Sequence, residues 1–202
     1  MGAADRRSVW TRRHATAVEP ARPSPFVVTC LDALTLQQAE SDTLGPSRRL
    51  ALDLACGSGR HALLMAERGY RVEAVDYALP ALVALRAEAA ERTLAVHCLA
   101  ADVTAWPLPH ARYELVVVVN FLERGLFPAL RDAIRPGGAL LFETFLEGQE
   151  RYGHPRNPAY LLRSGELARA LSGWKILASH EGPTTRGREP VMLAGVLARK
   201  PS

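Results

Sequence analysis

The stretch LALDLACGSGRHALL, residues Leu50 to Leu64, decides the fold. Asp53 lies in an apolar, strand-like run, and Gly57 and Gly59 follow it just before a helix-like stretch. A buried carboxylate costs free energy unless a partner satisfies it, and glycines at such a place let a ligand approach the backbone. The stretch therefore predicts a ligand site between a strand and a helix, with Asp53 facing a donor group of the ligand.

Length and composition indicate one globular domain. The chain has 202 residues, of which 48% are hydrophobic and 23% charged, and these proportions are typical of soluble globular proteins. We expect a single domain over residues 1–202, with an N-terminal arm at 1–25 and a core at 26–200. Prolines at positions 20, 23 and 25 exclude one continuous helix through the arm.

Membrane and secretion signals are not visible in the sequence. No apolar run approaches the roughly 18 to 20 residues of a membrane helix, and the N-terminal stretch MGAADRRSVWTRRH is too polar for a signal peptide. Cys30, Cys56 and Cys98 form no CxxC pair, so neither a disulfide framework nor a zinc site is indicated. We therefore expect a cytoplasmic protein with reduced thiols, no membrane partner and no metal.

The positive charge does not point to nucleic acid. The formal net charge is +4, and the arginines are scattered along the chain, with Lys175 and Lys200 as its two lysines. A nucleic-acid-binding protein needs a basic stripe or an aromatic RNA-binding motif. We therefore expect no nucleic-acid partner.

Strand-like and helix-like segments alternate between residues 26 and 145. The expected strands are 49–55, 70–76, 94–102, 113–120 and 139–145. The expected helices are 26–39, 59–69, 79–92 and 126–134, with a short helix in 103–110 and a turn at 135–138. Such alternation predicts an α/β fold with a doubly wound parallel sheet.

The C-terminal part has a different pattern. A loop at 146–160 and a short helix at 164–171 precede two strand-like runs, 174–182 and 189–200, which a loop at 183–188 joins. Two consecutive strands with so short a connection must be antiparallel. The tail therefore adds a hairpin to the parallel sheet.

The glycine pattern leaves two classes of cofactor open. Residues 57–62 fit GxGxxA, a variant of the dinucleotide fingerprint, so an NAD(P)-dependent oxidoreductase is one alternative. In a dehydrogenase, however, the strand that leads into the glycines is apolar, because no cation there satisfies a carboxylate. Asp53 instead suits a ligand with an ammonium group, as S-adenosylmethionine has.

The segment LDLACGSGR resembles motif I of the class I S-adenosylmethionine-dependent methyltransferases, (D/E)xxxGxG. Asp53, Cys56, Gly57 and Gly59 match it position by position. Ala55 stands where glycine is commoner, and we expect this change to be harmless if the backbone torsion there is ordinary. The resemblance covers about residues 49–200 and implies a Rossmann-like seven-stranded sheet of order 3-2-1-4-5-7-6, with strand 7 antiparallel, in a three-layer sandwich.

The resemblance also implies which residues bind the cofactor. Asp76 is expected to accept hydrogen bonds from both ribose hydroxyls, and Tyr77 to lie along the adenine. Asp102 is expected to accept from the adenine amine, with the Val103 amide facing a ring nitrogen. The full expected set is Asp53, Ala55, Cys56, Gly57, Gly59, Arg60, Asp76, Tyr77, Asp102, Val103 and Asn120.

Within the class, the chain resembles the tellurite-resistance methyltransferases and the small-molecule thiol-type enzymes near them. The resemblance lies in CGSGRHALLMAERGYRVEAVD and in the C-terminal tail, and it implies that Arg60 lies near the methionine carboxylate. It implies S-adenosylmethionine as methyl donor, S-adenosylhomocysteine as product and a small-molecule acceptor of the thiol or metalloid-oxyanion type. A monomer and a homodimer both remain open.

The residues expected on the substrate side come from variable segments. Trp10 and Arg13 resemble a Trp-x-x-Arg element of many small bacterial methyltransferases, whose N-terminal arm lies over the cofactor. Arg186, in the expected loop between the last two strands, suits an anionic substrate. Tyr152 and Tyr160 belong to the long loop after the fifth strand, an expected lid.

No catalytic motif is explicit, and the catalytic residues stay unassigned. We expect in-line displacement at the sulfonium methyl, for which a soft anion needs alignment and desolvation but no general base. A hydroxyl or carbon acid would need a base, and His154 and Glu143 are the first candidates, although Glu143 fits a strand-end salt bridge equally well. The sequence contexts of His61, His97, His110 and His180 suggest packing or solvent exposure.

Three rival functions remain open at this point. The first is the oxidoreductase, in which an Asp53→Ala change should hardly alter cofactor affinity. The second is a non-catalytic module that binds S-adenosylmethionine without turnover. The third is an RNA or protein methyltransferase, for which the sequence shows no docking surface.

Overall fold

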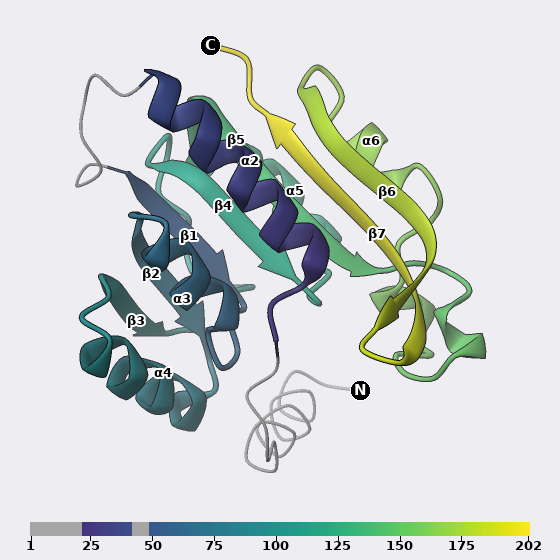
Figure 1. Ribbon diagram of the computed structural model, residues 1–202. Coiled ribbons are helices and arrows are strands. Elements are labelled where there is room, and N and C mark those ends of the chain that lie inside the picture. The colour runs from purple at the N-terminus through teal and green to yellow at the C-terminus, as the bar shows by residue number, and fades with distance from the viewer. Residues whose placement is uncertain (1–21, 42–48) are drawn as a thin grey trace.

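A seven-stranded sheet forms the centre of the structure, a computed structural model that describes residues 22–41 and 49–202 (Figure 1). The strand order is β3-β2-β1-β4-β5-β7-β6, and β7 runs antiparallel to both of its neighbours. This confirms the expected α/β fold and strand order. The strands are β1 Leu50–Leu54, β2 Arg71–Asp76, β3 Val96–Ala100, β4 Tyr113–Val119, β5 Ile134–Phe145, β6 Lys175–Arg186 and β7 Glu189–Arg199.

Helices cover both faces of the sheet and complete the three-layer sandwich (Figure 1). On one face lie α2 Pro25–Ser41, α3 Arg60–Glu67 and α4 Leu79–Glu91, and on the other lie α5 Phe127–Ala133 and α6 Glu166–Ala170. Three short 3₁₀ helices, η2 Arg124–Leu126, η3 Gln149–Arg151 and η4 Pro158–Tyr160, lie in the connections.

The two faces of the sheet carry separate hydrophobic cores. Along β1, Ala51 packs toward α2, α3 and α4, whereas Leu52 and Leu54 pack toward α5 and α6. The same alternation continues along β4, where Val117 and Val118 belong to opposite cores. Successive side chains of a strand point to opposite faces, so Asp53 shares the α2–α4 face with Ala51.

Two segments between β3 and the end of β5 differ from the expected secondary structure. The helix expected in 103–110 is wrong, because this segment forms turns. Its start is fixed by Asp102, whose Oδ1 accepts hydrogen bonds from the amide and the hydroxyl of Thr104, and Pro107 and Pro109 then prevent helical bonding. The turn expected at 135–138 lies inside β5, as a bulge between Ile134, which pairs with Tyr113, and Ala139, which pairs with Leu115.

The loop expected at 183–188 is wrong as well. The ladder between β6 and β7 continues from Lys175–Arg199 to Arg186–Glu189, so Gly187 and Arg188 alone form the turn. Gly187 has a φ of 63°, which suits the tight turn of a two-residue hairpin. Arg186 is therefore a strand residue, not a loop residue.

The described part of the chain shows neither a membrane-spanning helix nor a cluster of metal ligands. Within residues 22–41 and 49–202, none of the helices is both long and apolar enough to pass through a membrane. Over the same residues, no three His, Cys, Asp or Glu side chains gather in a way that could hold a metal ion.

Candidate active site

The glycine loop that follows β1 has a left-handed backbone at three positions. The φ values of Ala55, Gly57 and Gly59 are 57°, 55° and 77°, and α3 begins directly after the last of them. A Cβ on Gly59 would lie 2.3 Å from Cδ1 of Leu85 on α4, so packing as well as torsion requires glycine there. The condition for a harmless alanine at position 55 is not met, because left-handed torsions cost an L-residue energy.

Asp53 is the unsatisfied group of this loop. Its residue is 2% exposed, the backbone amide of Ala62 donates to it, and Oδ2 has no hydrogen-bond partner within residues 22–41 and 49–202. Burial raises the pKa of Asp53 from 3.8 to about 7, against the lowering effects of the Ala62 amide and Arg60. A buried carboxylate oxygen without a partner fits a site that a cationic donor completes.

Asp76, at the end of β2, supports the same loop. Its Oδ2 accepts a hydrogen bond from the Gly57 amide at 2.8 Å, and its Oδ1 accepts one from the Ala78 amide at 2.8 Å. Each carboxylate oxygen carries a second lone pair, so the two bonds leave acceptor capacity for a ligand. Asp76 therefore shapes the glycine loop in addition to the ligand contact expected from the sequence.

The remaining residues expected around an adenine follow β2 and β3. Tyr77 directly follows Asp76, and the amide of Ala101 donates to the carbonyl of Asp76, which ties the two strand ends together. Asp102 caps the turn at Thr104, and the side chain of Val103 is buried. The ends of β1, β2 and β3 thus bring Asp53, Asp76 and Asp102 to one edge of the sheet, as expected.

A second polar group lies at the ends of β4 and β5. Asn120 has a φ of 59°, and its amide donates to the carbonyl of Glu143 at 2.9 Å. Nη2 of Arg186 donates to Oδ1 of Asn120 at 2.6 Å and lies 3.8 Å from Oε2 of Glu143. The guanidinium of Arg186 lies over the Phe145 ring at 5.0 Å. Asn120, Glu143 and Arg186 therefore form one cluster.

His180 completes this cluster and was missed by the sequence analysis, which expected packing or solvent exposure. Its Nε2 lies 3.1 Å from Oε1 of Glu143. The two residues belong to β6 and β5, and Gly195 of β7 pairs with both of them. This contact could be predicted only from the register of β5, β7 and β6, which the sequence does not reveal.

Arg60 connects the two polar groups electrostatically. Burial lowers the pKa of Arg60, while the charges of Asp53 and Glu143 raise it. Burial also lowers the pKa of Arg186, which Glu143 raises and Arg60 lowers further. Two buried carboxylates and two partly buried guanidinium groups therefore share the space above the ends of β1 and β5.

His61 and His154 differ in burial and in their contacts. His61 is buried, and burial lowers its pKa to about 3. Its neutral Nε2 accepts a hydrogen bond from the Ser24 amide at 3.2 Å, which confirms a packing role. His154, one of the two base candidates, is exposed, whereas Glu143 is 1% exposed. The structure therefore favours Glu143 as the buried ionisable group.

The two expected lid residues, Tyr152 and Tyr160, differ in their exposure to solvent. Tyr152 is 43% exposed, and Tyr160 is partly buried at the end of η4. Trp10 and Arg13 lie outside the described residues. The segment itself is anchored through Gln149, whose Oε1 accepts from the Met192 amide and whose Nε2 donates to the His154 carbonyl.

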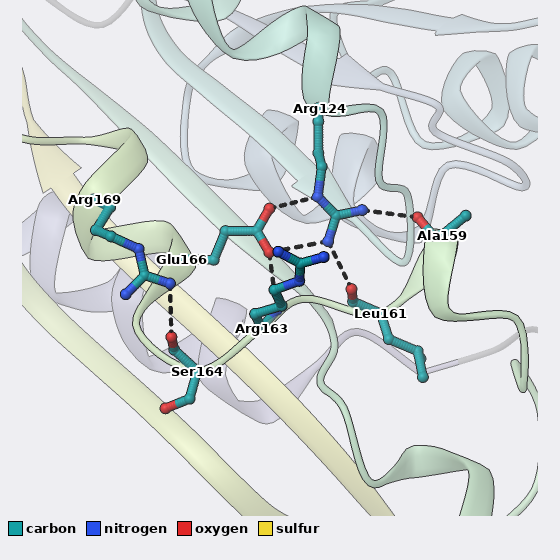
Figure 2. A network of polar contacts seen from close by, with 7 residues as sticks. All are labelled: Arg124, Ala159, Leu161, Arg163, Ser164, Glu166 and Arg169. Carbon is teal, nitrogen blue, oxygen red and sulfur yellow. Dashed lines mark hydrogen bonds and ion pairs between the residues drawn. The ribbon is translucent and has the colours of Figure 1, made fainter.

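Arg124 fixes the far end of the segment after β5, as Figure 2 shows. Its guanidinium forms a two-pronged ion pair with Glu166 at 2.6 and 2.9 Å. The same group donates to the carbonyls of Ala159 and Leu161 at 3.0 and 2.8 Å. The second oxygen of Glu166 also accepts from the Arg163 amide. One arginine therefore ties η2, η4 and α6 together.

Comparisons with known proteins agree with this arrangement. A family model described as a methyltransferase domain matches residues 51–138. A malonyl-[acyl-carrier protein] O-methyltransferase of Pseudescherichia vulneris is 32% identical over 157 residues, which are 71% of this chain and 57% of that protein. A ubiquinone biosynthesis O-methyltransferase of Idiomarina loihiensis is 33% identical over 52% of this chain and 46% of its own length. The chain thus spans about half to three fifths of the length of these curated relatives.

Solved structures share the fold at lower sequence identity. TehB from Haemophilus influenzae superposes with a TM-score of 0.68 at 20% identity, over 83% of this chain and 62% of that one. Geranyl diphosphate C-methyltransferase from Streptomyces coelicolor, solved with S-adenosyl-L-homocysteine, gives 0.66 at 15% identity, over 98% and 100%. Together with the sheet order and the glycine loop, these similarities show that the chain has the fold of the class I S-adenosylmethionine-dependent methyltransferases and that its residues 51–138 match a methyltransferase domain.

Proposed function

We propose that this protein transfers a methyl group from S-adenosylmethionine to a small-molecule acceptor. The observation that carries the proposal is the buried Oδ2 of Asp53, beside a glycine loop of left-handed torsions, for which the described part of the chain offers no hydrogen-bond partner. The ammonium group of the cofactor's methionine end is the kind of donor that such an oxygen requires. When bound, the cofactor supplies an electrophilic sulfonium methyl group.

In this proposal, different residues bind the methionine, ribose and adenine parts of the cofactor. Asp53 and the loop from Ala55 to Gly59, with Cys56 and Gly57, hold the methionine end, and Arg60 faces its carboxylate. Asp76 uses its remaining lone pairs for the ribose hydroxyls. Tyr77, Asp102 and Val103 surround the adenine, and Asn120 lines the cofactor beside the second polar cluster.

The acceptor is expected at the cluster of Asn120, Glu143 and Arg186. A thiol or a metalloid oxyanion is one proposed class, because Arg186 offers a counter-charge to an anion. A hydroxyl compound is the other, because Glu143 offers a buried carboxylate oxygen that accepts no hydrogen bond from the residues that the structure describes. The proposed contribution of Trp10, Arg13, Tyr152 and Tyr160 is to close the acceptor side.

We further propose that residues 1–202 act as one methyltransferase domain in the cytoplasm, as a monomer or a homodimer. The three cysteines are free thiols, in keeping with a reducing compartment. Neither a nucleic acid nor a membrane is needed as a partner in this proposal.

A transfer experiment tests the proposed activity. The protein is incubated with S-adenosylmethionine and, in separate reactions, dithiothreitol, tellurite, selenite or catechol, and S-adenosylhomocysteine is quantified by mass spectrometry. Acceptor-dependent formation of S-adenosylhomocysteine supports the proposal. Tight binding of S-adenosylmethionine with no turnover on any acceptor would favour a binding module, and NADH-dependent reduction in its place would favour an oxidoreductase.

A further inference from the structure

Glu143 is a buried carboxylate with spare acceptor capacity. Its residue is 1% exposed, and among the described residues Oε2 has no hydrogen-bond partner, while Nη2 of Arg186 lies 3.8 Å from it. Arg186 already donates to Asn120 at 2.6 Å, so this cation is engaged elsewhere. A carboxylate oxygen buried in this way is costly unless a ligand donates a hydrogen bond to it.

The other oxygen of Glu143 is held by a contact that the fold builds specifically. His180 of β6 reaches across β7 to Oε1 of Glu143, and it can do so because Gly195 stands between them. A Cβ on Gly195 would lie 2.5 Å from Nε2 of His180 and 2.8 Å from Cε1 of Phe26. The Phe26 ring packs edge-on against His180 at 4.5 Å. Gly195 and Phe26 therefore fix the imidazole, and the imidazole orients the carboxylate.

The position of Glu143 places it beside the reacting part of the cofactor. In open parallel sheets, ligands bind where the strand order reverses, which in this sheet is between β1 and β4. The Asn120 amide, which follows β4, donates a hydrogen bond to the Glu143 carbonyl. The charges of both Asp53 and Glu143 raise the pKa of Arg60. If Asp53 faces the methionine ammonium, Glu143 lies on the side of the sulfonium and the acceptor.

We propose that the acceptor is a hydroxyl compound and that Oε2 of Glu143 takes its proton, with His180 as a positioning residue. This inference rests on the proposed function and specifies its acceptor. An oxygen lone pair forms the new O–CH₃ bond, the S–CH₃ bond breaks with its electron pair going to sulfur, and the hydroxyl proton moves to Oε2. The proton passes from Oε2 to solvent after the methylated product leaves. A pre-ionised anion gains nothing from such a carboxylate, because like charges repel.

Sinefungin tests this placement without a known acceptor. It carries an amine-bearing carbon in place of the sulfonium and its methyl group, so its ammonium lies where the transferred methyl lies. Affinities for sinefungin and for S-adenosylhomocysteine are measured by calorimetry on the full chain and on Glu143→Gln. We expect Glu143→Gln to weaken sinefungin by about 10-fold or more, the effect of losing a charge-assisted hydrogen bond, and to leave S-adenosylhomocysteine unchanged.

Two controls separate the possible results. Asp53→Asn should weaken both ligands equally, because both carry the methionine ammonium, and Glu91→Gln, an exposed change on α4, should alter neither. An unchanged ratio of the two affinities in Glu143→Gln overturns this inference while the proposed function stands. Failure of the unaltered protein to bind S-adenosylhomocysteine overturns the proposed function and this inference with it.

The positioning role of His180 has its own readout. His180→Gln places an amide donor near the position of Nε2, whereas His180→Leu removes the hydrogen bond. We expect the Leu variant to lose the sinefungin preference and the Gln variant to recover most of it, with both binding S-adenosylhomocysteine normally. Equal ratios in both variants and in the unaltered protein would contradict the positioning role.

Discussion

Nε2 of His180 lies 3.1 Å from Oε1 of Glu143 although the whole of β7 separates their strands. The contact crosses Gly195, the one residue of β7 that pairs with both. The absence of a side chain at one ladder position thus assembles the polar cluster at the ends of β4 and β5.

Gly195→Ala should therefore separate the pair. The new methyl group would lie 2.5 Å from Nε2 of His180 and 2.8 Å from the Phe26 ring, and such overpacking costs about 1 to 3 kcal/mol of unfolding free energy. Urea denaturation measures the loss. Gly125→Ala is the matched control, because its nearest neighbour would be 3.8 Å away. Equal stabilities of the two variants would contradict the steric account.

Ala55→Gly should stabilise the protein. The φ of 57° at Ala55 is left-handed, and relief of this strain is worth about 1 kcal/mol, less the entropy that glycine gains in the unfolded chain. Ala87→Gly, in the exposed middle of α4, should instead destabilise by about 1 kcal/mol. Thermal unfolding of both variants compares them, and a loss of stability in Ala55→Gly would show that the torsion is relaxed in solution.

Asp53 should make the ligand-free protein less stable as the pH rises. Its pKa is about 7 in the folded protein and 3.8 ordinarily, so between these values the folded state holds a proton that the unfolded state lacks. Stability then falls as pH rises from 3.8 to about 7, by an amount on the order of 4 kcal/mol, and stays low above that window. Asp53→Asn removes this dependence and should be more stable than the unaltered protein at pH 8.

The pH dependence that Asp53 causes is measured as a difference between two proteins, because His61 changes the stability with pH in the opposite direction. The pKa of His61 is lowered from 6.5 to about 3, so its contribution to stability grows as pH rises through that window. Unfolding free energies of the unaltered protein and of Asp53→Asn are therefore subtracted at each pH from 4 to 8. A difference that does not change with pH would contradict the raised pKa of Asp53.

Arg124→Gln should loosen the segment after β5 without unfolding the protein. It removes the ion pair with Glu166 and the bonds to the Ala159 and Leu161 carbonyls (Figure 2). Because the Arg124 side chain is 40% exposed, solvent screens its ion pair and we expect about 1 kcal/mol of lost stability, but several-fold faster chymotryptic cleavage at Tyr152 or Tyr160. Arg156→Gln, an exposed change in the same segment, serves as control. Equal cleavage rates would show that Arg124 does not hold the segment.

Much of the fold could be predicted from local patterns. The alternation of apolar runs and amphipathic stretches identified the strands from β1 to β5, and the short tail connection identified the antiparallel hairpin. The helix expected in 103–110 failed because an Asp side chain and two prolines satisfy or block backbone bonding there, which outweighs apolar spacing.

The site was predictable only where it is local in sequence. Asp53, Asp76 and Asp102 lie close to the carboxyl ends of three parallel strands, so the topology alone gathers them. The pairing of Glu143 with His180 depends on the register of three strands and on the missing side chain at Gly195. Neither the register nor the position of Gly195 between the two residues can be deduced from a single sequence. The strained torsion of Ala55 was equally hidden, because alanine normally avoids it.

The most direct test of the central claim is a calorimetric titration of the protein with S-adenosylhomocysteine, beside Asp53→Asn and with NADH as the competing ligand. Asp76→Ala is a poorer choice, because it also removes the carboxylate that holds the Gly57 amide. We predict micromolar binding of S-adenosylhomocysteine, at least about 10-fold weaker binding to Asp53→Asn, and no binding of NADH. Binding of NADH alone, or equal affinities in the two proteins, would contradict the assignment of Asp53 to the cofactor ammonium.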